Sequence, residues 1–554
     1  MTRRLVARLV VILALCGMDP AQAFGSCEDA DYMQRFDPRL PASSCRIVHE
    51  TLIRWRGGPV PLRVVVPGGE AATADESLFR ERIDALVSRF GPAMDEMGGL
   101  EMGKVTILLS TLTDDGTHAA ATAPSGECQV TFYKTRDQPS VEDFLFTMSH
   151  ELFHCVQYRT WPDIPGEENA MWWGEGTADY FAHLANPGST GADHFIADFD
   201  QSSHRRALVD MEYESQVFFL WLGQNEGAPG VRDFIGRMAR STNREAQLDA
   251  MRRSIPLDAW MAFSQDYVDR RIRLPGGRAL PGRITSRGTT VIDGPTTLSF
   301  DTGAYVLVRQ KLQFKKGRTY TLALDSGSGG FRSRFDQARG EWTDPPERVM
   351  ACDEDKIHKV LSLAVDWDEL RYTIEVQESE LLDERACCLV GSWQPTEAAM
   401  RSEPDMALAT TQSVLASHGV DMQCGVNGGG WTLEFSPDGS GSVKWRGFSY
   451  RCVVSESGGA LANTFIRNGR TGFNWSILDR GVGRADYTEN SLAWTHEAQF
   501  GPRLTTRVLP DAGASAPANN FSFTCSDTSL SIQGIYGLNH QQGEYTRIGT
   551  PPAR

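Results

Sequence analysis

Two short stretches of this chain carry residue types that together could bind a metal ion. The first, residues 150–154, reads His-Glu-Leu-Phe-His inside a pattern typical of a helix. Positions i and i+4 of a helix lie on the same face, so both imidazoles can reach one ion. Glu151 is rotated from His150 by roughly 100° around the helix axis, so it flanks the ion instead of binding it. That position suits a carboxylate that polarises a metal-bound water.

The second stretch, residues 172–181, reads Trp-Trp-Gly-Glu-Gly-Thr-Ala-Asp-Tyr-Phe and supplies an acidic third ligand, Glu175. Two histidines and one carboxylate leave a fourth position for water, which is the open arrangement of a catalytic zinc site. The predicted Zn²⁺ ligands are therefore His150, His154 and Glu175. This stretch is also typical of a helix, on which Asp179 faces the same way as Glu175. Asp179 can accept the second ring N–H of a metal-bound histidine.

The competing interpretation is an amphipathic helix whose histidines are satisfied by hydrogen bonds alone. Against it, Ser140 can cap the helix and Asp143 stands at its third position, which places the motif well inside the helix. The apolar covering that would bury the imidazoles consists of Phe144, Leu145, Met148, Leu152, Phe153 and Val156. Cys155 could be a soft ligand beside His154, but it points to another face of the helix.

The two motifs together resemble the gluzincin branch of the zinc peptidases, the superfamily of thermolysin and the gluzincin aminopeptidases. The resemblance covers roughly residues 60–275 and is strong only at the motifs, including Gly174 and Gly176 around the acidic ligand. It implies the metal ligands named above, Glu151 as general base and then general acid, and Asp179 as the residue that orients the first histidine.

Amide hydrolysis also needs a donor to the tetrahedral oxyanion. Tyr213, at the start of a helical run over 213–222, is the candidate catalytic donor, although a buried tyrosine bonded to backbone would give the same pattern. His204 is a weaker candidate for the same task, since an exposed loop histidine explains it better.

The resemblance also bears on whether the enzyme would be an endopeptidase or an aminopeptidase. Gluzincin aminopeptidases carry a Gly-x-Met-x-Asn stretch before the metal helix, whereas residues 121–129 here read Ala-Thr-Ala-Pro-Ser-Gly-Glu-Cys-Gln. Glu127 could bind a substrate amine in its place or be a solvated loop carboxylate. The chain is therefore expected to act on internal peptide bonds more than on amino termini.

Residues 1–23 are typical of a secretory signal peptide, with a basic start, an apolar run and a small-residue cleavage site at Ala21-Gln22-Ala23. This segment carries three Arg and one Asp, so its removal changes the formal net charge from −16 to −18. An acidic surface argues against nucleic acid and anionic membranes as partners. Because no later segment is apolar enough to span a bilayer, the expected protein is secreted or periplasmic, with no integral membrane segment.

Ten cysteines remain after the signal peptide, and an even number in an exported chain indicates disulfides. Cys27 with Cys45 and Cys424 with Cys452 are the simplest local pairs. Cys128 with Cys155 would tie the segment before the metal helix to that helix. The sequence does not determine the connectivity.

The predicted fold is multidomain, with an α+β gluzincin-like zinc metallopeptidase domain over 24–283 followed by two all-β domains. In the first domain we expect strands at 61–66 and 105–110, a helix at 77–97, and an edge strand at 129–133 immediately before the metal helix. In gluzincins that edge strand pairs with the substrate backbone, and an unpaired edge in any sheet offers N–H and C=O groups to an extended peptide.

A Pro/Gly-rich linker is predicted at 273–290, and the pattern beyond it changes to short alternating strands. A β-sandwich domain over 284–380 is expected first. A β-barrel-like domain over 381–554 follows, whose Gly-x-Trp opening and meander of strands weakly resemble a lipocalin. Residues 427–430 and 510–520 are expected to be loops of this last domain.

These features predict an exported zinc-dependent peptidase that hydrolyses a peptide or protein substrate. The alternative is a catalytically inactive, zinc-stabilised binding protein whose β domains bind a ligand or partner. Neither interpretation fixes the oligomeric state.

Overall fold

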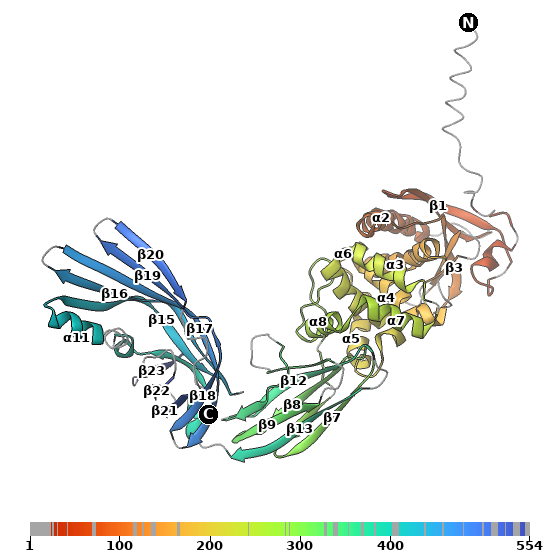
Figure 1. Cartoon of the computed structure of the whole chain (residues 1–554). Coiled ribbons are helices and arrows are strands. Elements are labelled where there is room, and N and C mark those ends of the chain that lie inside the picture. The colour runs from red at the N-terminus through yellow and green to blue at the C-terminus, as the bar shows by residue number, and fades with distance from the viewer. Residues whose placement is uncertain are drawn as a thin grey trace, which may run out of the picture.

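The computed structural model describes residues 24–548 with short gaps. The gaps are 25–26, 30, 41, 69–73, 115–118, 124–126, 135–139, 163–166, 242, 283, 287, 326–329, 336–341, 353, 367–369, 382–383, 402–408, 437–438, 457–458, 480, 501–502, 511–518, 527 and 536–542. The expected signal peptide therefore lies outside the described residues. Within them, a part with helices and a five-stranded sheet is followed by two four-stranded sheets and a ten-stranded one (Figure 1). A multidomain chain of helices and several sheets is thus confirmed at this coarse level.

The five-stranded sheet belongs to the N-terminal part of the molecule. Its strand order is β1 (Cys45–Trp55), β2 (Gly58–Pro67), β3 (Val105–Thr113), β5 (Cys128–Lys134) and β4 (Ala119–Thr122). β1 and β2 form an antiparallel hairpin, β2, β3 and β5 run parallel, and β4 pairs antiparallel with β5. Side chains alternate between the faces. Val64 and Ile107 pack in the core with the helices, whereas Val65 and Leu108 pack against residues 32–40.

The prediction of an edge strand at 129–133 is wrong in detail. Those residues form β5, which lies between β3 and β4, and the edge is the four-residue strand β4. The sequence Ala-Ala-Ala-Thr of β4 has almost none of the β-branched and aromatic side chains by which strands are recognised, so it was not expected to be a strand. Its pairing with β5 fixes it in place.

Seven longer helices cover the sheet and continue beyond it. They are α2 (Ala74–Met97), α3 (Val141–Thr160), α4 (Glu167–Ala185), α5 (Asp193–Ser202), α6 (Gln216–Met238), α7 (Arg244–Ser254) and α8 (Leu257–Val268). The 3-10 turns η3 (Leu208–Asp210) and η4 (Tyr213–Ser215) precede α6. α6 is broken at Gly227, whose φ is +75°, a conformation that glycine adopts without steric penalty.

The start of α3 follows the expected capping pattern. The Ser140 side chain accepts a hydrogen bond of 3.1 Å from the backbone N–H of Asp143. Glu142 and Asp143 place negative charge in the first turn, where the helix dipole favours it. The motif of residues 150–154 therefore lies in the middle of a well-formed, largely buried helix.

The two four-stranded sheets pack face to face around one core. One contains β10 (Gly330–Phe335), β12 (Lys356–Leu363), β8 (Val308–Phe314) and β6 (Thr289–Ile292). The other contains β11 (Arg348–Ala351), β9 (Arg318–Asp325), β13 (Leu370–Leu381) and β7 (Thr296–Thr302). Leu312 and Val360 of the first sheet meet Phe300 and Tyr372 of the second in the core between them.

The sandwich shares buried surface with the helices. Tyr305 and Leu307 belong to the same core as α6 to α8, and the Tyr305 hydroxyl donates to the Ile255 carbonyl at 2.9 Å. Arg309, which is 4% exposed, forms an ion pair of 2.7 Å with Asp200 of α5. The segment expected to be a linker is also packed, because Leu274 and Leu280 in it are buried. The helices and the sandwich are therefore joined through a common core.

The C-terminal sheet is closed on itself. Its strands are β14 (Gly391–Pro395), β15 (Asp421–Phe435), β16 (Ser440–Glu456), β17 (Gly459–Asp479), β18 (Val482–Asn490), β19 (Ala493–Phe500), β20 (Arg503–Pro510), β21 (Asn519–Cys525), β22 (Ser529–Gln533) and β23 (Gly543–Ile548). Pairing runs from β14 through β15, β16, β17, β18, β21, β22 and β23 back to β14, which makes a ring of eight strands. We call these eight strands the C-terminal ring.

Two further strands extend the ring outward. β19 pairs with the first half of β17 and β20 pairs with β19, so these strands project as an open sheet (Figure 1). Residues 427–430 were expected to form a loop but belong to β15, in which the pairing with β16 shifts register at Gly428 and Gly430. Most of the segment 510–520 lies outside the described residues. Two short helices, α9 (Glu384–Leu389) and α11 (Ala409–Ser417), accompany the ring.

Five disulfides link the ten described cysteines, a number compatible with an exported protein. The predicted pairs Cys27–Cys45, Cys128–Cys155 and Cys424–Cys452 are all present. Cys352–Cys387 and Cys388–Cys525 were not predicted. Among the described residues, we find no helix with the length and apolar character needed to cross a membrane.

Candidate metal centre

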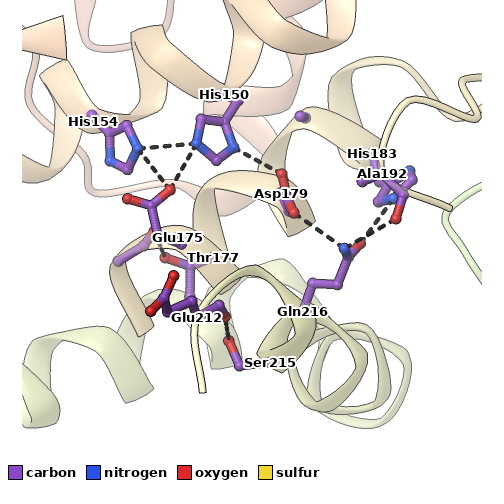
Figure 2. Close-up of polar contacts among 12 residues, drawn as sticks. His150, His154, Glu175, Thr177, Asp179, His183, Ala192, Glu212, Ser215 and Gln216 are labelled. Atoms are coloured by element: carbon purple, nitrogen blue, oxygen red, sulfur yellow. Dashed lines mark hydrogen bonds and ion pairs between the residues drawn. The ribbon is translucent and has the colours of Figure 1, made fainter. Parts of the chain in front are cut away.

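Helices α3 and α4 bring the two sequence motifs together. His150 and His154 come from α3 and Glu175 comes from α4 (Figure 2). His150 Nε2 lies 3.0 Å from Glu175 Oε2 and 3.1 Å from His154 Nε2, and His154 Nε2 lies 3.4 Å from the same oxygen. In a tetrahedral zinc site with bonds of about 2.1 Å, two ligand atoms are roughly 3.4 Å apart. These three residues could therefore hold one metal ion.

Hydrogen bonds behind the imidazoles decide which nitrogen atoms face the centre. His150 Nδ1 lies 2.8 Å from Asp179 Oδ1, and His154 Nδ1 lies 2.7 Å from Gln157 Oε1. Both oxygens are acceptors, so each Nδ1 carries the proton and each Nε2 presents a lone pair. When both imidazoles are neutral, two lone pairs and a carboxylate oxygen therefore converge on one point. A cation at this point would stabilise the arrangement, which fits a divalent metal.

The groups behind the ligands continue into α6. Asp179 Oδ2 accepts a hydrogen bond of 3.1 Å from Gln216 Nε2, and Gln216 Oε1 lies 3.1 Å from His183 Nε2 (Figure 2). The side-chain amide of Gln157 donates to the Gly174 carbonyl at 2.9 Å. Asp179, Gln157 and Gln216 are all buried. Each imidazole of the centre is thus hydrogen-bonded to a side chain, Asp179 or Gln157, that makes a further hydrogen bond of its own.

The electrostatics of the centre favour positive charge. Burial disfavours the protonated form of His150, but Asp179 and Glu175 outweigh this effect and raise the pKa of the imidazole well above its usual value. Burial disfavours the ionised form of Glu175, yet the two histidines outweigh it and hold the pKa of the carboxyl far below its usual value. A proton and a metal ion would compete for the same site.

Glu151 lies beside the three ligands and is 8% exposed. Burial raises the pKa of its carboxyl, while the charges of His150 and His154 and a hydrogen bond from the Ala121 backbone of β4 lower it in part. A carboxyl whose pKa lies closer to neutrality can both take up and release a proton. The contact with Ala121 also links the carboxylate to the edge strand.

Tyr213 of η4 is brought to the centre as well. Its ring stacks on that of His150 with a centroid separation of 5.8 Å and on that of Phe195 with one of 4.6 Å. Burial raises the pKa of Tyr213, and the charges of Glu175 and Glu151 raise it further, so the hydroxyl stays protonated at neutral pH. A neutral hydroxyl beside the centre can donate a hydrogen bond.

A cavity of about 300 Å³ opens at the centre, and we call it the metal pocket. Its walls are Ala119–Ala121 of β4, Glu151 and His154 with the following turn of α3, the start of α4 around Glu175, and Tyr213. This volume is at the lower end of the range for small-molecule sites. The pocket therefore combines two of the three metal-binding side chains, His154 and Glu175, with the carboxyl of Glu151, the hydroxyl of Tyr213 and strand β4.

The two glycines around Glu175 have different surroundings. A Cβ at Gly174 would meet nothing within 4 Å, which places this residue against open space. A Cβ at Gly176 would collide with the Ser215 hydroxyl and lie 3.0 Å from the Phe219 ring. α4 and the η4–α6 segment therefore approach each other closely at Gly176, where a side chain has no room.

Three other residues considered from the sequence do not belong to the centre. Glu127 is neither solvated nor near the pocket, because it is 5% exposed and forms an ion pair of 3.5 Å with Arg63 on the other side of the sheet. His204 accepts a hydrogen bond from Arg205 and does not line the pocket. Cys155 is bonded to Cys128 and so is not a ligand.

Sequence reasoning did not identify Gln157, Gln216 or the strand β4. Gln157 stands three positions after His154, a spacing that places both on one face of a helix and could have indicated the contact. Gln216 and β4 come from separate elements and gave no local signal.

Comparisons with known proteins add no family to this picture. No protein-family model matches the chain, and no curated protein matches its sequence.

Proposed function

We propose that this chain is a zinc-dependent peptidase that hydrolyses internal bonds of a peptide or protein substrate. The observation that carries the proposal is the convergence of two imidazole lone pairs and one carboxylate oxygen, with a second carboxyl, Glu151, beside them in an open pocket. An inert structural site would instead surround its metal with four protein ligands. Gluzincin-type chemistry is the reaction class that uses this set of residues.

Within that reaction each group of the chain has a defined task. His150, His154 and Glu175 would hold the zinc, which lowers the pKa of a bound water towards about 7 and polarises a carbonyl group. Glu151 takes the proton of the attacking water and transfers it to the leaving amine. Tyr213 donates a hydrogen bond to the oxygen on which negative charge develops.

The edge strand supports a peptide as the substrate class. Among the described strands, β4 pairs only with β5, and its residues Ala119–Ala121 line the metal pocket. An unpaired strand edge presents backbone N–H and C=O groups at the spacing of an extended peptide. Because the four side chains of β4 are small, a substrate backbone can approach it closely.

The decisive test is Glu151→Gln in the zinc-loaded protein. This change removes the proton acceptor and keeps the shape, so turnover of a proteome-derived peptide library should fall by about 10²–10⁴-fold while zinc content is unchanged. Glu142→Gln is the matched control, because Glu142 is an exposed carboxylate on the same helix that pairs with Arg89. Equal cleavage by Glu151→Gln and the parent protein would show that the assigned base is wrong.

Glu175→Ala tests the metal assignment independently of turnover. Removing the carboxylate leaves two imidazoles, so the isolated protein should lose most of its bound zinc when metal content is measured by mass spectrometry. Glu142→Ala is the control. Full zinc content in Glu175→Ala would refute the ligand set, and zinc-loaded parent protein that cleaves no peptide would favour a zinc-stabilised binding protein.

A further inference from the structure

A second cavity adjoins the metal pocket. It measures about 380 Å³ and shares Met171 of α4 with the metal pocket. Its other walls come from the segment 209–212, which leads into Tyr213, and from Arg244 and Gln247 of α7. Met171 is therefore a wall that the two cavities have in common.

The charges of the groups that line the second cavity do not sum to zero. Arg244 binds both carboxylate oxygens of Asp210, with Nε–Oδ1 at 2.6 Å and Nη2–Oδ2 at 2.8 Å. This bidentate pair neutralises both charges. The remaining charged wall residue is Glu212, so the walls of the cavity carry two carboxylates, one guanidinium and a net charge of −1.

Glu212 has a fixed backbone and a free side chain. Its N–H donates to Glu214 Oε2 at 3.2 Å, and its carbonyl accepts a hydrogen bond of 2.6 Å from the Ser215 hydroxyl. The side chain extends away from Ser215 (Figure 2), and it is exposed. No described residue forms a hydrogen bond or ion pair with its carboxylate. An anchored residue therefore presents an uncompensated negative charge at the cavity.

We propose that the second cavity is a substrate subsite for a lysine or arginine side chain, with Glu212 as the group that binds its positive charge. This inference rests on the proposed peptidase function and specifies its substrate. A basic side chain can pass over the apolar Met171 with its methylene groups and place its charged end at Glu212. The guanidinium of Arg244 is already bound to Asp210, so it does not compete with the substrate for the Glu212 carboxylate.

The test compares peptides that differ at a single residue. Each peptide of the series carries lysine, arginine, citrulline, norleucine or glutamate at one position near the cleaved bond, and each is prepared with a free and with an acetylated amino terminus. We expect the parent protein to show a higher kcat/KM for lysine than for norleucine at one subsite. Glu212→Gln should reduce this lysine-to-norleucine ratio by about 10-fold, because a charge-assisted hydrogen bond at a partly exposed site is lost.

Charge reversal and a matched control complete the experiment. Glu212→Lys should move the preference from lysine to glutamate. Glu245→Gln, an exposed carboxylate in the first turn of α7 that lines neither cavity, should leave the ratio unchanged. Zinc content and thermal unfolding of each variant show that the fold is intact.

The outcomes separate this inference from the function on which it rests. A parent protein that cleaves peptides with the same ratio as Glu212→Gln overturns the subsite and leaves the peptidase in place. Dependence on a free amino terminus, without dependence on the basic side chain, also overturns it. A zinc-loaded parent protein that cleaves none of the peptides removes both proposals.

Discussion

The metal-binding part and the C-terminal ring bury different kinds of side chains. Around α3, α4 and α6 the buried side chains include ionisable and amide groups that contact one another, among them His150, Glu151 and Asp179. The ring is filled with aromatic side chains: Trp393, Trp431, Phe435, Trp445, Phe448, Phe473, Trp475 and Phe521. Among its described residues the buried charged one is Arg467, whose guanidinium lies 4.3 Å from the Trp445 ring centroid.

This contrast separates an interior of connected polar groups from an interior of packed aromatic rings. Buried polar groups weaken a fold unless each finds a partner, so a connected cluster of them indicates a functional demand. An interior of packed aromatic rings has no such demand and gives a rigid scaffold.

The largest expected effect is a loss of stability when a large side chain is removed from the core of the C-terminal ring. Trp431 is 4% exposed and lies 4.5 Å from Trp445 between ring centroids. Trp431→Ala should destabilise the ring by about 3–5 kcal/mol, since a large cavity is left. Hydrogen exchange should report faster opening of β15 and β16, with zinc content and peptide turnover unchanged. Leu504→Ala, at a side chain that is 60% exposed, is the control. Loss of turnover in Trp431→Ala would show that the two regions act as one.

A smaller effect is expected from acid on the metal-binding part. Burial lowers the pKa of His183 to about 4, although its hydrogen bond with Gln216 opposes this. The unfolded chain takes up this proton near pH 6.5 and the folded chain does not. The contribution of His183 to the free energy of unfolding is therefore complete above pH 6.5. It falls as the pH drops towards 4 and levels off below that pH. The total is about 3 kcal/mol.

His183→Gln isolates that contribution, because glutamine keeps a hydrogen-bonding side chain and cannot titrate. Free energies of unfolding from urea titrations between pH 7.5 and 4 should decline less steeply in the variant than in the parent protein. Identical slopes would mean that the imidazole accepts its proton without unfolding, contrary to its complete burial.

The smallest expected effect concerns the residue behind the first imidazole. Asp179→Asn keeps a hydrogen-bond acceptor for His150 and removes a charge, so zinc affinity should fall by about 10–100-fold while the fold is retained. Competition with a chelator measures this affinity. Asp198→Asn on α5, an exposed carboxylate, is the control. An unchanged affinity would show that the orientation of His150 is fixed by packing alone.

Local patterns in the sequence predicted much of the centre. The helix of residues 150–154, its cap at Ser140 and the facing helix with Glu175 and Asp179 follow from periodicity over one or two turns. The pair Cys128–Cys155 could also be anticipated, because a bond there joins neighbouring segments. Placing the ligands within 4.8 Å of one another required the packing of α3 on α4, which the spacing made plausible and the structure shows.

Contacts between segments that are far apart in the sequence could not be predicted, for physical reasons. Glu127 is buried because Arg63 and the Tyr32 hydroxyl reach it from elements that are 64 and 95 positions away in sequence. β4 exists because β5 offers it a partner. The sandwich continues the helical core because Tyr305 inserts into it, and nothing in the alternation of its strands indicates this. Such features depend on tertiary packing, which overrides local propensity.

The missing side chain at Gly176 has a consequence for the width of the metal pocket. Glu175 and Tyr213 both line the pocket, and the segments that carry them pack closely at Gly176, where the backbone of α4 meets the Ser215 hydroxyl and the Phe219 ring. A methyl group at Gly176 would collide with these side chains, so the two segments would have to separate and Glu175 would move away from the Tyr213 phenol. The separation of Glu175 and Tyr213 therefore depends on the absence of a Cβ atom at Gly176, a residue that does not line the cavity.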